Sequence, residues 1–197
     1  MEPQPFATAF VPFDGTPFDQ RADLAIRWIV ETERESGHTA RLILPDKIDY
    51  PDPIRSFKSR RPWSSLRSRK ALGIGPVLVM STGMEGLEKA DRFGQDRGIA
   101  YVASSHDYWI DGWAVTVGAV DLRSGRQAES PSQEIGELLG DLDRAGNNGW
   151  YAQGYKTEDV RLILSQLDKH VSRDFVAGSM LAQGHSVKSV RNRLWPV

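Results

Sequence analysis

The stretch GPVLVMSTGMEGLEKADRFGQDRGIAYVAS, residues 75–104, decides the fold. Val77 to Met80 is a short, continuous apolar run, which is typical of a strand buried on both faces of a parallel sheet. Residues 84–97 carry apolar side chains at helical spacing, with charged side chains between them. Residues 99–103 form a second apolar run. The stretch therefore predicts two parallel strands joined by a helix through a right-handed crossover.

The same pattern occurs once more upstream. Residues 6–13 (FATAFVPF) predict a first strand, Arg21 to Glu35 predict an amphipathic helix, and Thr39 to Leu44 predict another strand. Because strands alternate with helices through this half of the chain, we expect an α/β fold. Its form would be a Rossmann-like three-layer α/β/α arrangement with a mainly parallel sheet.

The remainder of the chain is mostly helical in pattern. A short helix is predicted at residues 110–116 and a short strand at 119–122. We therefore expect an α/β sheet domain at residues 1–125 and a helical C-terminal subdomain, residues 126–197, packed on it. The four later helices are predicted at residues 131–145, 157–170, 174–182 and 187–194.

Residues 46–73 differ from both patterns, and we expect a basic, irregular loop there, with one irregular helix over residues 55–70 as the alternative. The segment Arg55 to Lys70 has no acidic residue, and Phe57 and Trp63 are interleaved with its cations. Arginine suits phosphate geometrically and aromatic rings stack on bases, so the segment could bind nucleic acid. A solvated loop whose aromatic residues anchor it to the sheet is the alternative. Its basic residues are Arg55, Lys58, Arg60, Arg61, Arg67, Arg69 and Lys70.

Composition narrows the class of protein. Of the 197 residues, 40% are hydrophobic and 26% charged, which is typical of a folded globular chain. The formal net charge of −1 gives no global field that attracts polyanions, so such binding needs a local patch. The absence of cysteine excludes disulfides and cysteine chemistry. Without a signal-like start or a long apolar run, we expect a cytoplasmic protein that does not enter a membrane.

The turns after the predicted strands are polar and would meet at one edge of the sheet, where ligands of parallel sheets bind. Ser81, Thr82 and Gly83 precede a helix and could hold a phosphate with backbone N–H groups. An ordinary helix cap is the alternative explanation. Ser104 and Ser105 follow the next strand along the chain and are further candidates for ligand binding. No P-loop or dinucleotide fingerprint occurs, so we predict no cofactor.

The same edge holds the weak catalytic candidates. His106 beside Asp107 could act as an acid–base pair, with Asp14 at the neighbouring strand end. Together with Asp46, these carboxylates could bind magnesium, although any parallel sheet collects acids in this position. The histidines show no zinc-ligand spacing. We therefore predict no metal site.

The last two predicted helices have the spacing of a helix-turn-helix. A glycine turn at Gly184 to Ser186 separates them, and the second helix carries Lys188, Arg191 and Arg193. Packing of this helical pair against the rest of the protein is the alternative.

The skeleton from Gly75 through Gly118, together with AGNNGW at residues 145–150, resembles uncharacterised bacterial proteins of actinobacterial or phage type. The resemblance spans about half of the chain and implies no activity.

Three functions remain open at this stage. The first is a non-catalytic module that binds nucleic acid or another phosphate-bearing ligand through the basic segment. The second is an enzyme or sensor that binds a nucleotide-like small molecule at the carboxyl edge of the sheet. The third is a structural or interaction protein, for example a homo-oligomer that pairs through exposed aromatic residues.

Overall fold

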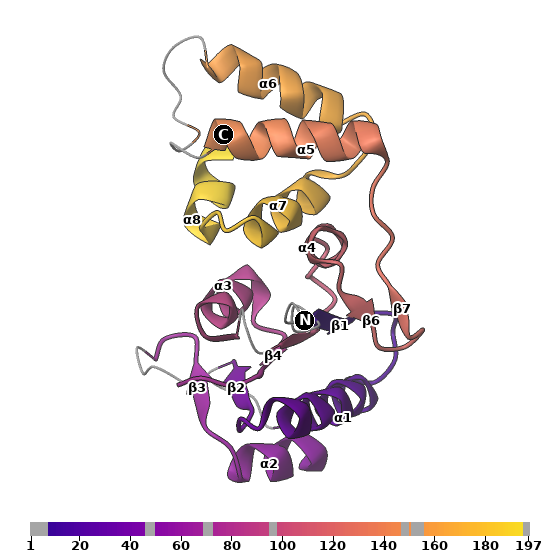
Figure 1. Ribbon diagram of the computed structural model, residues 1–197, viewed down its shortest axis with the longest axis vertical. Coiled ribbons are helices and arrows are strands. Elements are labelled where there is room, and N and C mark those ends of the chain that lie inside the picture. Colours follow the sequence, from indigo (N-terminus) through magenta and orange to yellow (C-terminus); the bar gives the residue numbers. More distant parts are fainter. Residues whose placement is uncertain are drawn as a thin grey trace. The chain divides into compact units, whose positions relative to one another are not determined.

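The computed structural model describes residues 8–45, 50–68, 73–94, 98–146, 150 and 156–194. The chain divides into two compact units (Figure 1). The first unit consists of residues 1–107 and 119–127, and the second of residues 108–118 and 128–197. The chain therefore leaves the first unit after residue 107 and contributes residues 108–118 to the second unit. It then returns to the first unit for residues 119–127, and the rest of the chain belongs to the second unit.

One seven-stranded sheet organises the first unit, and its order is β3-β2-β4-β5-β1-β6-β7. All neighbouring pairs are parallel except β6 and β7, which form an antiparallel hairpin. The two central strands β4 and β5 are buried along their whole length, as their continuous apolar sequence predicts. The strands are β1 (Thr8–Val11), β2 (Arg41–Leu44), β3 (Trp63–Ser65), β4 (Val77–Met80), β5 (Ile99–Val102), β6 (Val120–Asp121) and β7 (Arg126–Gln127).

Helices cover both faces of this sheet and give the first unit three layers (Figure 1). Helices α1 (Phe18–Ser36) and α2 (Asp52–Ser59) lie on one face, and α3 (Gly83–Gly94) lies on the other. The mainly parallel α/β fold expected from the alternation of strands and helices is thus confirmed. The core under α1 and α2 is built from Ala22, Ala25, Ile29, Ile54, Phe57, Leu42, Leu78, Met80 and Val102.

Residues 50–68 differ from the irregular loop expected for them, because they contain α2 and β3. The prolines that suggested a break begin the helix instead: Pro51 is its N-cap residue and Pro53 lies in its first turn, where no intrahelical N–H is lost. Ile54 and Phe57, three residues apart, turn one face of α2 into the core. The basic segment is therefore an amphipathic helix followed by an edge strand.

The second unit is all-helical and is built around the crossing of α4 (Ile110–Val117) and α7 (Arg173–Ala182). Ser172 caps α7 by accepting a hydrogen bond from the backbone N–H of Phe175. All six residues from Val176 to Leu181 are buried, so α7 is the central helix of this unit. The other helical segments are α5 (Gln133–Gly146), α6 (Lys156–Leu167), α8 (Val187–Ser189) and a π-helical turn at Val190–Leu194 that continues α8.

Helix α1 of the first unit is amphipathic and packs on the sheet through one face only. Gly37 ends it in a left-handed conformation, with φ of 67°, and donates its N–H to the carbonyl of Glu33. Within the residues described, no helix is both long and apolar enough to cross a membrane.

Candidate functional site

The carboxyl ends of β4, β5 and β1 lie next to one another in the sheet. Two backbone hydrogen bonds join the turns that follow them: Ser81 donates its N–H to the Val102 carbonyl, and Ala103 donates to Val11. The turn at residues 81–83, the turn at 104–107 and Asp14 are consequently neighbours at one edge, as the parallel arrangement predicts.

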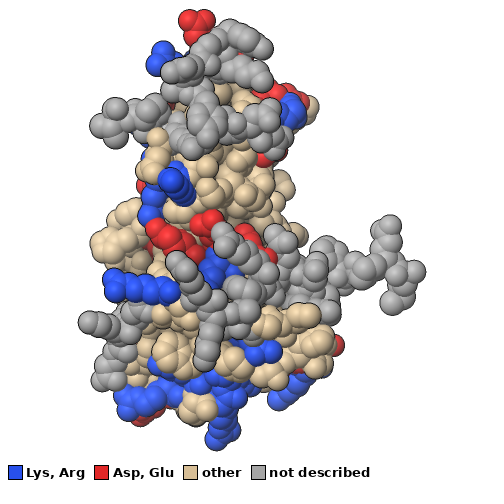
Figure 2. Space-filling view, turned by 90° about the vertical axis from the view of Figure 1, so that its left-hand side faces the viewer, with Lys and Arg blue, Asp and Glu red and all other residues tan. Residues whose placement is uncertain are grey.

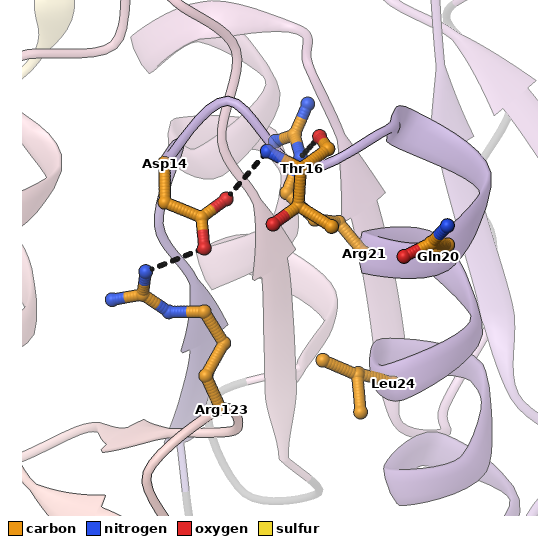
Figure 3. A pocket seen from close by; sticks show the side chains of 6 residues that line it. All are labelled: Asp14, Thr16, Gln20, Arg21, Leu24 and Arg123. Atoms are coloured by element: carbon orange, nitrogen blue, oxygen red, sulfur yellow. Dashed lines mark hydrogen bonds and ion pairs between the residues drawn. The ribbon is translucent and has the colours of Figure 1, made fainter.

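A hollow of about 380 Å³ opens at this edge, between the turn after β1, the first two turns of α1 and the turn after β6 (Figure 3). Asp14 was a candidate site residue from its sequence position, whereas the other residues that line the hollow were not. The residues that line it are Asp14, Thr16, Gln20, Arg21, Leu24 and Arg123.

Arg21 is the buried cation of this hollow, with 4% of its surface exposed. Its Nε donates to the Thr16 carbonyl at 3.0 Å, and its Nη1 donates to the Ala103 carbonyl after β5. The guanidinium also lies over the Phe13 ring, 5.0 Å from its centroid. Burial lowers the pKa of Arg21 from its ordinary value, and the nearby Asp14 charge opposes this, but an arginine remains charged at any physiological pH.

Asp14 and Arg123 form an ion pair across the mouth of the hollow. Arg123 Nη1 lies 2.8 Å from Asp14 Oδ2, and the second oxygen of Asp14 accepts the backbone N–H of Thr16 at 2.9 Å. These two bonds lower the pKa of Asp14 well below its ordinary range, so the carboxylate remains charged. Arg123 also contacts Asp121 of β6 at 3.2 Å. Its charge is thus shared between two carboxylates.

The turn between β4 and α3 is strained. Ser81 has φ of +47°, a left-handed conformation that a non-glycine residue rarely adopts, and Gly83 follows with φ of +68°. The Thr82 hydroxyl is buried and has no hydrogen-bond partner among the described residues. It fills the space above Gly86, where a Cβ would lie only 1.6 Å from its oxygen. The Thr82 side chain therefore packs against α3 and does not cap this helix with a hydrogen bond.

The turn after β5 is held by Asp107. Its Oδ2 accepts three hydrogen bonds, from the Tyr101 hydroxyl, the Ser104 hydroxyl and the Ser104 backbone N–H. Burial, and then the Asp107 charge, raise the pKa of Tyr101 well above its usual value, so the phenol acts as a donor. His106 is exposed and Ser105 is half-buried. The bonds given for Asp107 thus support the turn rather than a paired histidine.

The acidic residues at this edge do not gather into a metal site within the described part of the chain. No group of three or more histidine, aspartate or glutamate side chains lies close enough there to hold an ion. Asp14 is engaged by Arg123, and Asp107 by Tyr101 and Ser104. Asp46 lies outside the described residues.

One of the basic residues predicted to bind nucleic acid is held inside the protein. Arg61 Nη2 lies 2.5 Å from Glu33 Oε2 on α1, and Arg61 Nε donates to the same oxygen at 3.2 Å. The guanidinium lies 3.9 Å from the centroid of the Phe57 ring. Glu33 also accepts the backbone N–H of Ala40 before β2. Arg61 therefore fastens α2 to α1 and is not a free cation.

Among the other described cations of this segment, Arg55, Arg60 and Arg67 are exposed, and Lys58 lies against Trp63 on the edge strand β3. Arg55 is paired with Asp52 of the same helix, with 3.6 Å between Nη1 and Oδ1. Lys58 Nζ lies 3.9 Å from the centroid of the Trp63 ring, which is 46% exposed. Arg60 is exposed, and the structure gives it no ion pair within the described residues. Lysine and arginine side chains gather at the lower end of the first unit, at the level of α2 (Figure 2). We define the α2–β3 surface as Arg55, Lys58, Arg60, Trp63 and Arg67.

Lys89 of α3 holds the β3 part of this surface through hydrogen bonds. Its Nζ lies 2.6 Å from Ser64 Oγ, 2.7 Å from the Ser65 carbonyl and 2.7 Å from the Ser68 carbonyl. Three bonds from one ammonium group satisfy all its donors and bind the strand and its following turn to the helix. The exposed tryptophan therefore lies on a strand that is paired with β2 on one side and hydrogen-bonded to Lys89.

The remaining predicted cations do not join this surface. Arg69 and Lys70 lie outside the described residues. Lys188 and Arg191 belong to the second unit, where both are exposed at helical spacing on the segment that follows α7. Val187, Val190 and Leu194 of that segment are buried in its own unit.

Sequence reasoning missed Arg21 and Arg123, which shape the hollow. A signal for Arg21 existed, because it stands in phase with Ala25 and Ile29 on the buried face of α1. A charged residue at a core position points to a specific role for its charge. Arg123 offered no such signal, since its partner Asp14 is 109 residues away.

Comparison with known protein families, with curated proteins and with solved structures finds no match to this chain. The resemblance to uncharacterised bacterial proteins therefore stays a prediction. Functional inference rests on the residues themselves.

Proposed function

We propose that this protein is a binding module for nucleic acid or a similar polyanion, and that it binds through the α2–β3 surface. Single-stranded nucleic acid is the form that fits this surface best. Binding of this kind requires a positive surface for the backbone and an exposed aromatic ring for the bases. The α2–β3 surface offers both on a chain whose net charge is only −1.

The observation that carries the proposal is the stacking of Lys58 on the exposed Trp63. The Trp63 side chain is 46% exposed, and β3 presents it at the open edge of the sheet beside exposed cations. A base stacked on the ring would bring its phosphates to Lys58 and to the neighbouring Arg60. Stacking of this type contributes about 1–3 kcal/mol per base and tolerates any sequence.

The exposed ring of Trp63 favours single strands over a duplex. It lies on the short edge strand β3, where its face is accessible to a base. A flat ring can reach a base only when the base is unstacked from its neighbours.

The test is fluorescence anisotropy with labelled oligonucleotides of about 12 nucleotides, single-stranded and duplex, at about 50 and 200 mM salt. We expect single-strand binding that weakens at least about tenfold between these salts. The Arg60→Ala variant should bind more weakly and show a smaller salt dependence, because one phosphate contact is lost. Trp63→Ala should weaken binding about tenfold at both salts, because stacking is not electrostatic.

The matched control is Arg126→Ala. Arg126 is an exposed arginine on β7, at the opposite edge of the same sheet, and its loss changes the net charge equally. Binding that falls equally in Arg126→Ala and Arg60→Ala would show a non-specific charge effect and contradict the proposed surface. Wild-type protein that does not bind single strands at low salt would contradict the function itself.

A further inference from the structure

The hollow at the end of β1 is lined by a buried arginine, Arg21, to which no carboxylate of the described residues is bonded. Arg21 is nearly fully buried, and its bonds go to two neutral carbonyls, those of Thr16 and Ala103. Within the described residues no carboxylate bonds Arg21 directly; Asp14 acts on it only through its charge, and the oxygens of Asp14 bind Arg123 and Thr16. An anion in the hollow would add a second negative charge beside this buried cation.

The first turn of α1 adds donors on the same side. Its N-cap residue is Pro17, which provides no side-chain cap, so the N–H groups of the first turn have no cap from the chain. Gln20, in this turn, lines the hollow together with Arg21 and Thr16 (Figure 3). Helix N-termini favour anions through these N–H groups and the helix dipole. An anion in the hollow would therefore lie near both Arg21 and the first turn of α1.

The remaining lining residues have a different character. Asp14, in the turn after β1, is a charged acceptor, and Leu24 of α1 contributes apolar surface. The hollow measures about 380 Å³, at the small end of the range of ligand pockets and much larger than a single phosphate ion needs. A ligand that fills it needs an anionic group at one end and hydroxyl donors at the other.

We propose that the hollow binds a small phosphate monoester that carries hydroxyl groups, such as a sugar phosphate or a nucleoside monophosphate. The phosphate contacts Arg21 and the first turn of α1, and the hydroxyl groups donate to Asp14. This site is separate from the α2–β3 surface and does not depend on the function proposed for it.

The test uses thermal unfolding and isothermal titration calorimetry with defined probes. The probes are ribose 5-phosphate and adenosine monophosphate, with inorganic phosphate, ribose and adenosine as comparisons. Ligands that bind only the folded state raise the melting temperature in proportion to their occupancy. We expect the two monoesters to raise it, inorganic phosphate to do so less, and the two uncharged compounds to leave it unchanged.

The decisive variant is Gln20→Glu, which keeps the shape of an exposed side chain and adds a negative charge beside the phosphate. We expect monoester binding at least about tenfold weaker, because the added carboxylate lies beside the doubly charged phosphate and repels it. Gln133→Glu on α5, in the other compact unit, is the matched control and should bind as the wild type does. The variant Arg21→Met removes a bond to each of two turns and can unfold the protein, so the conclusion rests on Gln20→Glu.

Three outcomes overturn the proposal. The first is the absence of any monoester effect on the wild-type protein. The second is equal binding by Gln20→Glu and the wild type, which would place the ligand elsewhere. The third is inorganic phosphate binding as tightly as the monoesters, which would remove the role assigned to the hydroxyl groups. Monoester binding that is retained in Arg60→Ala and lost in Gln20→Glu supports it and separates it from the α2–β3 surface.

Discussion

Gly112 on α4 and Gly178 on α7 each lie against a backbone carbonyl of the other helix. A Cβ at Gly112 would lie 1.8 Å from the carbonyl oxygen of Phe175, and a Cβ at Gly178 would lie 1.9 Å from that of Trp109. The Ser179 hydroxyl donates to the Gly112 carbonyl at the same crossing. The two helices approach as closely as backbones can, so neither position has room for a side chain.

We therefore expect Gly112→Ala and Gly178→Ala to destabilise the second unit strongly. A methyl group at either position must push backbone aside, and overpacking of this kind costs about 3 kcal/mol or more. Chemical denaturation followed by far-UV circular dichroism measures the loss. Helix propensity alone would make both variants more stable than the wild type, because alanine is favoured over glycine in a helix by about 1 kcal/mol.

Gly136 on α5 is the matched control for this pair. It is also a helical glycine, but nothing lies within 4 Å of the position its Cβ would occupy. Gly136→Ala should therefore raise the free energy of unfolding by about 1 kcal/mol. If Gly112→Ala were as stable as Gly136→Ala, the close crossing of α4 and α7 would be wrong.

A second prediction concerns the ion pair between Glu33 and Arg61. Both side chains are largely buried, and both nitrogens that Arg61 uses bind one carboxylate oxygen. Arg61→Ala should lower the free energy of unfolding by about 1–2 kcal/mol, since it leaves Glu33 without its counter-ion. Arg61→Lys should recover only part of this, because lysine lacks the planar group that stacks on Phe57.

Arg27→Ala is the comparison for Arg61. Arg27 pairs with Asp23 one turn earlier on α1, and this pair is exposed. Exposed pairs of this type contribute about 0.5 kcal/mol or less. An Arg61→Ala variant as stable as Arg27→Ala would show that Arg61 is a surface cation after all and available to a polyanion.

The fold could be predicted from the sequence because its information is local. The continuous apolar runs at 77–80 and 99–102 predict strands that are buried on both faces. The helical spacing between the two runs predicts the helix that connects them. The basic segment was harder, since Pro51 and Pro53 can either break a helix or begin one. Only the packing of Ile54 and Phe57 on the sheet decides between these.

The candidate sites could be predicted only in part, for the same physical reason. Strand ends are local features, so the sequence placed Asp14 at the correct edge of the sheet. Its partner Arg123 follows from how the β6–β7 hairpin joins the sheet beside β1, a contact between distant parts of the chain. The division of the basic residues into a buried Arg61 and an exposed Arg60 likewise depends on tertiary packing, because the two are adjacent in sequence.

A third prediction concerns Lys89, which supports the edge strand. Lys89→Met keeps the length of the side chain and removes the three bonds to Ser64, Ser65 and Ser68. We expect faster proteolysis after Trp63 and Leu66 and a loss of about 2–3 kcal/mol in the free energy of unfolding. Lys188→Met, on an exposed lysine of the second unit, should change neither. Equal protease resistance in the two variants would contradict the supporting role of Lys89.

The last prediction is a pH dependence that arises at Asp91 on α3. Burial, and then the neighbouring Glu88 charge, raise the pKa of Asp91 from 3.8 to about 6. A carboxyl group with a higher pKa in the folded state binds its proton more tightly there, so this contribution favours folding below about pH 4 and is lost as the pH rises through 6. At pH 8 the charged carboxylate is therefore destabilising, by roughly 3 kcal/mol. Asp91→Asn should raise the free energy of unfolding by about that amount at pH 8 and leave it nearly unchanged at pH 4.

Urea denaturation at both pH values measures the difference, with Glu129→Gln on an exposed segment as the control. A gain of equal size at both pH values would mean that the asparagine acts through packing or a new hydrogen bond, and that the charge of Asp91 is not the cause.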